Sequence, residues 1–234
     1  MTDFVSNLST KAGVVFDVDG TLTDTESVWS KVEQKTLTAH GGIPEVSILT
    51  RFQGCSVPET AKIIRSYVPD PKPSLSALVD ELTGRFEMAL LMDPVDPMPG
   101  GLELLETLRA RAIPTAAVSN SPRRVVELTL RITGLYEFVE LIVCAGDDPE
   151  LKPKPAPDLY TFAARGLAIN PHLSWGVEDT RPGLLALRAA HFLPVAVQPD
   201  AVPERGPMLV TRTLRNLDID WLFATAAFRK SSRT

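Results

Sequence analysis

The sequence GVVFDVDGTLTDTE, residues 13–26, joins a short apolar run to a closely spaced pair of aspartates. The run Val14–Phe16 predicts a buried strand that ends where Asp17 and Asp19 follow, with one residue between them. Alternation along an extended chain sends both carboxylates to one side, and Gly20 lets the backbone turn away sharply. Two carboxylates this close repel each other unless a cation or a shared proton lies between them. The spacing therefore predicts a divalent metal site.

A strand end capped by turn-forming Asp and Gly would explain a lone DxDG equally well. The match in this chain is longer, because FDVDGTLTDTE resembles the nucleophile motif of the haloacid dehalogenase superfamily, in the branch that carries DxDGTL(x)D. The resemblance implies that companion motifs follow downstream in a set order.

Charge and length limit the classes of function. The chain has 234 residues, enough for one good core and a smaller appended module. A net charge of -5 and a pI near 5.3 predict no basic patch for nucleic acid or an anionic membrane. An anionic substrate must therefore be attracted by local groups and a metal.

Cysteines and apolar runs bear on location. Cys55 and Cys144 lie far apart without CxxC or zinc spacing, which predicts free thiols that serve packing in a reducing compartment. The first eleven residues lack an apolar core, and no run approaches the ~18 apolar residues of a membrane span. We therefore expect no signal peptide, no membrane contact and a cytoplasmic location.

The segment after the first motif has helical spacing of apolar residues and no strand-like run. The predicted helices are Ser30–His40, Val57–Tyr67 and Leu75–Leu91. They could simply cover the sheet, but the resemblance implies an inserted helical cap. We therefore expect an α/β core domain over residues 1–24 and 94–234, and a helical cap domain over residues 25–93.

The remaining sequence alternates between strands and helices, and residues 229–234 are expected to be a frayed basic tail. The predicted strands are Ile113–Val118, Phe138–Cys144, Ser174–Val177, Pro194–Val197 and Met208–Val210. The predicted helices are Leu102–Arg111, Arg123–Thr133, Asp158–Gly166 and Pro182–Ala190. This alternation predicts an α/β fold of the doubly wound, Rossmann-like class: a parallel sheet with helices on both faces and its chemistry at the carboxyl ends of the strands.

Four strand or loop ends carry residue types that suit a phosphate and a magnesium ion. They are Asp17 with Asp19, Ser119 with Asn120, Lys154, and Glu178 with Asp179. Taken alone, Ser119 would be a helix N-cap, Lys154 a solvated loop lysine, and Glu178 with Asp179 a charged turn. Their order, however, is that of the superfamily's four motifs: DxDGT, a strand-terminal Ser, Lys in KPxPD, and ED. The KPxPD pattern selects Lys154 over Lys152.

The resemblance and general chemistry together imply a role for each residue. Asp17 is expected to attack phosphorus and form an aspartyl-phosphate, while Asp19 protonates the leaving oxygen and then deprotonates a water. Ser119 and Lys154 are expected to bind phosphoryl oxygens. The expected Mg²⁺ ligands are Asp17, the backbone carbonyl of Asp19, Glu178 and Asp179. The expected substrate-binding residues are Thr21, Trp29, Gly54, Ser56 and Asn120.

Departures from related motifs narrow the activity. The acid-base aspartate Asp19 argues against a dehalogenase. Residues 51–59 resemble the specificity loop of sugar-phosphate phosphatases and β-phosphoglucomutases, but Val57 and Trp29 stand where the mutases have Arg and His. The mutases also follow the Ser motif with a Lys and an Asn that bind a second phosphate, and Ser119-Asn120-Ser121-Pro122 has neither in that order. We therefore predict a phosphatase. The alternatives are a mutase that takes its charge from Arg51 or Lys62, and a non-catalytic binding protein.

The expected partner is a small phosphorylated metabolite, and resemblance alone favours a sugar phosphate or a phosphogluconate-like compound. We expect a monomer or a weak dimer, since no exposed apolar stripe requires a partner. The cap is expected to open and close over the site about hinges near Thr23–Thr25 and Asp93–Pro97.

Overall fold

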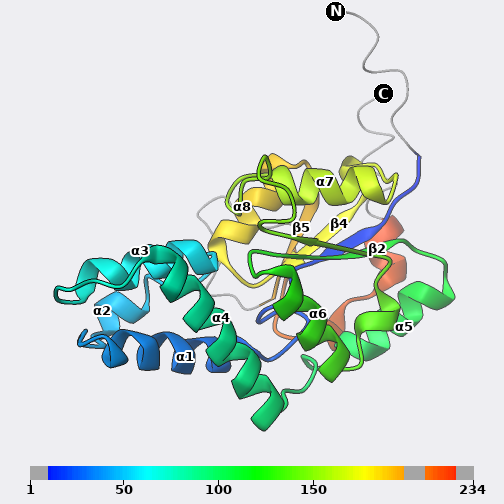
Figure 1. The fold of residues 1–234 in the computed structure, drawn as a ribbon. Helices are drawn as coiled ribbons and strands as arrows, with labels where there is room; N and C mark the ends of the chain where they lie inside the picture. The colour runs from blue at the N-terminus through cyan, green and yellow to red at the C-terminus, as the bar shows by residue number, and fades with distance from the viewer. Residues whose placement is uncertain (1–9, 198–208, 225–234) are drawn as a thin grey trace, which may run out of the picture.

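The computed structural model describes residues 10–197 and 209–224, which build a parallel six-stranded sheet with helices on both faces (Figure 1). The strand order is β3-β2-β1-β4-β5-β6, so the strand before the two aspartates is central. The strands are β1 Val14–Phe16, β2 Thr115–Ser119, β3 Leu141–Cys144, β4 Trp175–Glu178, β5 Leu193–Val197 and β6 Leu209–Thr211. The predicted fold class is confirmed.

Alternating side chains of the strands build a hydrophobic core on each face of the sheet. Val14 and Phe16 join the cluster beneath α5 (Gly101–Ala110) and α6 (Arg123–Ile132). Val15, which points the other way, joins the cluster beneath α7 (Asp158–Gly166) and α8 (Arg181–Ala189). Figure 1 shows these two helix pairs on opposite sides of the sheet. Burial on both faces explains why the strands are continuous apolar runs.

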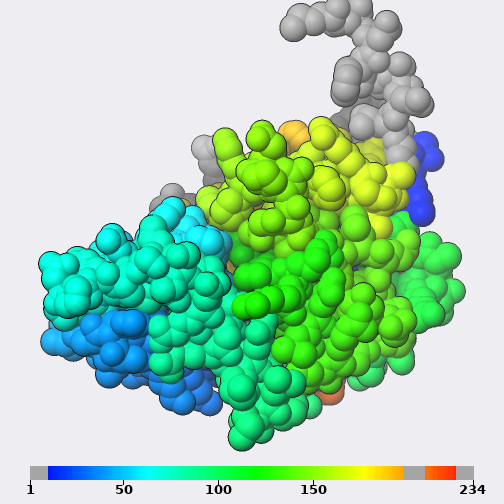
Figure 2. Space-filling view, in the orientation of Figure 1, coloured from blue at the N-terminus to red at the C-terminus, as the bar shows by residue number. Residues whose placement is uncertain are grey.

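Four helices between β1 and α5 form a separate lobe beside the sheet (Figures 1 and 2). Its helices are α1 Glu26–Ala39, α2 Val46–Leu49, α3 Val57–Tyr67 and α4 Leu75–Met92. They enclose their own cluster, in which Leu37, Ile64, Leu78 and Phe86 are fully buried. A capping box sets the start of α3. The Ser56 side chain accepts from the backbone amide of Glu59, and the Glu59 side chain accepts from the backbone amide of Ser56.

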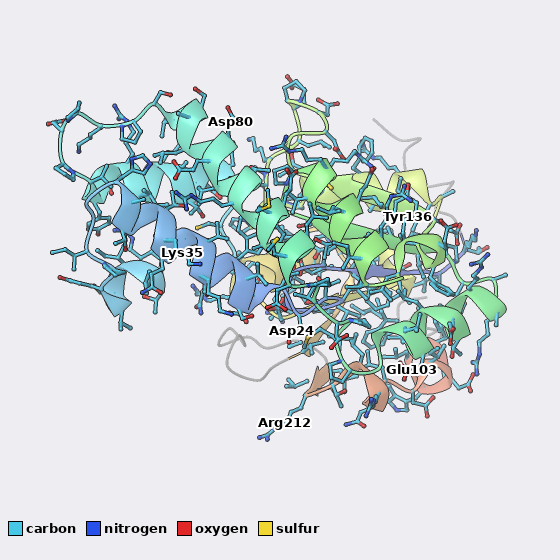
Figure 3. All side chains as sticks on the ribbon, turned by 60° about the horizontal axis from the view of Figure 1, so that its bottom comes forward. Asp24, Lys35, Asp80, Glu103, Tyr136 and Arg212 are labelled. Carbon is cyan, nitrogen blue, oxygen red and sulfur yellow. The ribbon has the colours of Figure 1, made fainter. Side chains whose placement is uncertain are left out.

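Two kinds of contact join this lobe to the sheet. The chain segments that enter and leave it pair with each other, because Thr23 bridges Pro97 and the Asp24 amide donates to Asp96 O at 3.1 Å. Asp24 marks this junction in Figure 3. On one side α4 packs against α6, where Val125 is buried in the cluster of the lobe. The domain boundaries at residues 24 and 93 stay a prediction.

Several element boundaries differ from the predictions for local reasons. Helix α1 begins at Glu26 instead of Ser30, and the one-turn helix α2 was not predicted. The amide of Ile113 still donates to Leu108 O at the end of α5, so β2 begins only at Thr115. Phe138 lies in the short 3-10 helix η1 (Tyr136–Phe138), which delays β3 to Leu141.

Two further 3-10 turns, η2 (Pro171–Leu173) and η4 (Leu214–Asn216), complete the elements of the described ranges. Met208 and residues 229–234, which the predictions included, lie outside those ranges. Both cysteines are unpaired, as expected. Across residues 10–197 and 209–224 no helix combines the length and apolar character that a membrane crossing requires.

Candidate active site

The carboxyl ends of β1, β2 and β4 lie side by side because β1 pairs in parallel with both neighbours. The chain leaves these strands at Asp17, Ser119 and Glu178, and the loop after β3 brings Lys154 to the same place. The four predicted motif segments therefore meet at one edge of the sheet. They form the floor of a cavity of about 230 Å³, and the helical lobe forms its other wall.

Lys154 is held against the carboxylate of Asp17. Its side chain is 3% exposed, and its ammonium group donates to Asp17 Oδ1, to Glu178 Oε1 at 2.7 Å and to Val118 O at 2.8 Å. The backbone amide of Lys154 donates to Asn120 Oδ1 at 2.8 Å, which anchors the loop. Burial opposes the charged form, but the attraction of Asp17 and Glu178 outweighs it and raises the pKa of Lys154. The ammonium group therefore stays charged beside Asp17.

Three carboxylates crowd this floor. Oxygen atoms of Asp17, Glu178 and Asp179 lie within 4.8 Å of one another. Burial, reinforced by the charge of Glu178, raises the pKa of Asp17 to about 8. Burial and the charge of Asp17 likewise raise the pKa of Asp179. One ammonium group does not compensate three buried acids, so the cluster is short of positive charge.

The cluster fits a divalent metal ion. Thr21 Oγ1 donates to Asp179 Oδ1 at 2.8 Å and orients that carboxylate. Space beside the other oxygen depends on Gly20, because a Cβ at Gly20 would lie 2.3 Å from Asp179 Oδ2. Carboxylate oxygens held in this way are suitable ligands for a hard cation such as Mg²⁺.

Glu178 has a different environment from the other two acids. Its Oε1 accepts from Lys154 and from the Tyr160 hydroxyl at 2.8 Å. Its Oε2 accepts from the Thr180 amide at 3.1 Å and the Thr180 hydroxyl at 2.9 Å. A Cβ at Gly183 would lie 1.7 Å from Oε1, so the backbone of α8 also packs tightly against this carboxylate. Both oxygens of Glu178 therefore have partners, and its direct effect is to orient Lys154.

Asp19 is turned away from the acidic cluster, toward the lobe. Its Oδ2 accepts from Ser119 Oγ at 3.1 Å and Ser121 Oγ at 2.9 Å, both from the end of β2. Its Oδ1 accepts from Thr25 Oγ1 at 2.8 Å and from the indole nitrogen of Trp29 at 3.1 Å. Donors from both sides of the cavity therefore hold this carboxylate, and its side chain lines the cavity together with Asp17.

The family model of haloacid dehalogenase-like hydrolase matches residues 11–191, which is more than half of the chain. The chain belongs to this family. It is 32% identical over 185 residues to (DL)-glycerol-3-phosphatase 1, mitochondrial, of Arabidopsis thaliana, covering 76% of this chain and 60% of that protein. It is 31% identical over 188 residues to the Arabidopsis thaliana bifunctional riboflavin kinase/FMN phosphatase, covering 79% of this chain and 48% of that protein. The chain thus spans about half to three-fifths of these two curated relatives.

A third relative is similar over nearly its whole length. Fructose-1-phosphate phosphatase YqaB of Escherichia coli (strain K12) is 29% identical over 180 residues, covering 76% of this chain and 92% of that protein. Among solved structures, β-phosphoglucomutase from Clostridium difficile superposes with a TM-score of 0.81 at 20% identity, over 94% of this chain and 99% of that one. At that identity the likeness supports the fold alone.

The residues of this haloacid dehalogenase-like hydrolase that the sequence predicts to bind substrate do not all line the cavity. Asn120 Nδ2 donates to Gly54 O at 3.1 Å, and both residues line the cavity with Trp29. Thr21 is fully buried beneath Asp179. Ser56 does not line the cavity, because its hydroxyl donates to Glu59 Oε2 at 2.7 Å within the capping box of α3.

Sequence reasoning missed several residues of the site, among them Thr180, which donates to Glu178. Ser121 and Thr25 hold Asp19, Tyr160 holds Glu178, and Glu33 faces the cavity from α1. Thr25 stands within the quoted stretch 13–26 and Ser121 stands two residues after Ser119, so a count of hydroxyl groups near each strand end would have found both. Tyr160 and Glu33 lie on helix faces, where sequence spacing carries no signal about the distance to a strand end.

Proposed function

We propose that this chain is a Mg²⁺-dependent phosphatase that hydrolyses a small phosphate monoester, such as a sugar phosphate, through an aspartyl-phosphate on Asp17. The observation that carries the proposal is the pairing of two differently held aspartates in one cavity. Asp17 lies in the acidic cluster with Lys154, and Asp19 accepts hydrogen bonds from neutral donors beside it. Environments that differ in this way suit a nucleophile and an acid-base group.

In the first step an Asp17 carboxylate oxygen attacks phosphorus and the bond from phosphorus to the ester oxygen breaks, while Asp19 gives that oxygen a proton. In the second step Asp19 takes a proton from water, the water oxygen bonds to phosphorus, and the bond to Asp17 breaks. We assign the binding of a phosphoryl oxygen through both steps to Lys154, which exchanges one of its three present acceptors for it, and to the Ser119 hydroxyl, which donates to Asp19 in this structure.

We assign the metal to Asp17 and Asp179, with the backbone carbonyl of Asp19 as a further ligand. Glu178 supports the site mainly through Lys154, since its oxygens already have partners. Bound Mg²⁺ supplies positive charge that offsets the repulsion between the carboxylates and a phosphate dianion.

Hydrolysis is favoured over phosphomutase activity. A mutase must hold a second phosphate with cations from the helical lobe. Of the two candidates for that task, Arg51 donates to the Tyr67 hydroxyl at 2.6 Å, with its guanidinium carbon 5.6 Å from the centre of the Tyr67 ring, and neither Arg51 nor Lys62 lines the cavity. Similar proteins include a fructose-1-phosphate phosphatase and a glycerol-3-phosphatase, whose names point to small phosphate monoesters as the class of substrate.

The test is phosphate release from sugar, polyol and nucleotide monophosphates and p-nitrophenyl phosphate, with Mg²⁺ or a chelator, by the wild type and Asp17→Asn. We expect release that requires both the metal and Asp17. Absence of phosphate release from every compound of the panel would overturn the proposal in favour of a binding protein. Conversion of β-glucose 1-phosphate with a bisphosphate primer would overturn it in favour of a mutase.

We also propose that residues 25–93 act as a cap that moves as one body, because α1 to α4 share a hydrophobic cluster. The two unpaired cysteines support a location in the reducing cytoplasm. We expect a monomer or weak dimer in solution, which light scattering on the eluting protein will test.

A further inference from the structure

The wall of the cavity that comes from the helical lobe carries two acidic side chains. Glu26 and Glu33, which are separated by two turns of α1, both line it, together with polar groups such as Ser30, Thr50 and Gln53. Within residues 10–197 and 209–224, the one lysine or arginine that lines the cavity is Lys154, at the floor. Lys31 and Lys35 are exposed and absent from the lining, although they share α1 with Glu33 (Figure 3 labels Lys35).

Glu33 has no partner for its carboxylate. Within the described part of the chain no hydrogen bond or ion pair reaches this side chain, although it is only partly exposed. Burial, with the charge of Glu26, raises its pKa to about 8. Cys55 is another titratable group nearby, and burial, with the charge of Glu59 and then that of Glu33, raises its pKa to about 11. In its ionised form Glu33 is therefore an acceptor that no residue of the described ranges satisfies.

The position of Glu33 in the lobe wall determines which part of a bound substrate lies beside it. If the phosphoryl group binds at Asp17 and Lys154, as the proposed function requires, the remainder of the substrate extends toward the lobe. Above about pH 8, where Glu33 is ionised, a second anion there would lose its water, gain no counter-charge and lie beside two charged glutamates. A hydroxyl group would instead donate to the unpaired carboxylate and offset its desolvation.

We propose that Glu33 is a specificity-determining residue, which selects phosphate monoesters whose remainder carries hydroxyl groups and no second anion. This inference rests on the proposed function and narrows its substrate class. It favours polyol and sugar monophosphates over bisphosphates and phosphorylated carboxylic acids. The phosphogluconate-like substrate that resemblance alone allows is thereby disfavoured.

The test compares substrates that differ at one terminal group. Sorbitol 6-phosphate and 6-phosphogluconate share six carbons, and glycerol 3-phosphate and 3-phosphoglycerate share three, with CH₂OH in one member and carboxylate in the other. We measure kcat/KM with Mg²⁺ at about pH 9, where a group of pKa about 8 is mostly ionised. The wild type should prefer the alcohol member by at least about tenfold.

Glu33→Gln keeps the shape of the side chain and removes the charge. It should lower the preference for the alcohol by about fivefold or more, chiefly through a higher kcat/KM for the carboxylate member. Glu45→Gln makes the same change at an exposed position of the lobe that does not line the cavity, and should leave the preference unchanged.

Two results would overturn the inference: equal kcat/KM for both members of a pair in the wild type, or the same preference in Glu33→Gln as in Glu45→Gln. The wild type is also assayed with p-nitrophenyl phosphate. If it releases no phosphate from any ester, the proposed function itself fails. Release from p-nitrophenyl phosphate without discrimination between the pairs contradicts only the role of Glu33.

Discussion

At the scale of single residues, Trp29 links the helical lobe to the acid-base group. Its indole nitrogen donates to Asp19 Oδ1 at 3.1 Å, and its ring stacks on Phe86 with the ring centres 3.9 Å apart. Trp29→Phe removes the donor but keeps an aromatic ring against Phe86. We expect kcat to fall about tenfold for alkyl phosphates, because Asp19 loses part of its orientation for proton transfer to a poor leaving group.

The leaving group separates this role from a general loss of structure. p-Nitrophenolate leaves without a proton, so Trp29→Phe should reduce p-nitrophenyl phosphate hydrolysis less than alkyl phosphate hydrolysis. Trp221→Phe, an exchange outside the cavity, serves as the control and should affect neither substrate. Equal losses on both substrates in Trp29→Phe would contradict a positioning role for the indole.

A second residue-scale prediction concerns Gly20, whose φ of +84° places it in the left-handed region. Gly20→Ala brings a Cβ to within 2.3 Å of Asp179 Oδ2 and should raise the Mg²⁺ concentration for half-maximal activity at least about tenfold. Gly134→Ala is the matched control, since Gly134 has φ of +73° and no atom within 4 Å of an added Cβ.

Both glycine variants should lose about 1–2 kcal/mol of unfolding free energy to the backbone conformation, as measured by urea denaturation. Only Gly20→Ala should change the metal requirement in a Mg²⁺ titration. An unchanged requirement would show that Asp179 is not a metal ligand, or that it shifts without cost.

At the scale of elements, several of the site residues that the sequence predicts follow strands directly. Asp17, Ser119 and Glu178 each stand at or just after a short apolar run, and parallel pairing brings such ends together whatever the lengths of the connections. Glu33 and Tyr160 reach the site from helix faces. Their distance depends on how a helix is rotated and docked, which apolar periodicity determines only to within a face.

Helix boundaries, too, are predicted well where a local sequence signal marks them. The bounds of α3 and α7 agree with the predictions, and in α3 local chemistry marks the start: Ser56 and Glu59 form a capping box. The missed α2 has only four residues, too few for a helical period to appear. The predicted start of α1 falls late because the helix opens with two polar, exposed residues, Glu26 and Ser27.

Movement of the lobe belongs to this scale as well. Asn120 Nδ2 donates to Gly54 O and closes the cavity on one side, while Glu87 and Arg124 pair at 3.0 Å between α4 and α6 on another. We expect crystals without and with a phosphate mimic to differ in the angle of α1 to α4 relative to the sheet. The bends should fall near residues 23–25 and 93–97, and the bond between Asn120 and Gly54 should break on opening. An identical angle in both crystals would contradict this hinge.

At the scale of the whole molecule, the stability of the metal-free protein should depend on pH through its buried acids. Burial raises the pKa of Asp17 from 3.8 to about 8 and that of Glu33 from 4.5 to about 8. Each group therefore holds its proton more tightly in the folded protein than in the unfolded chain. This contribution to stability is complete below about pH 4 and is lost as the pH rises to about 8.

With a chelator present, the unfolding free energy should therefore fall between about pH 5 and about pH 8, by up to about 1.4 kcal/mol per pH unit for each group. Excess Mg²⁺ should reduce this fall, because it binds the ionised form of Asp17 and favours the folded state at high pH. The part due to Glu33, which lies apart from the metal, should persist with Mg²⁺ and disappear in Glu33→Gln. Urea denaturation at several pH values, with chelator or Mg²⁺, measures each part. A free energy that stays level or rises with pH in the chelator would contradict the argument, because it would mean that the folded protein already supplies these carboxylates with the positive charge that we assign to the metal.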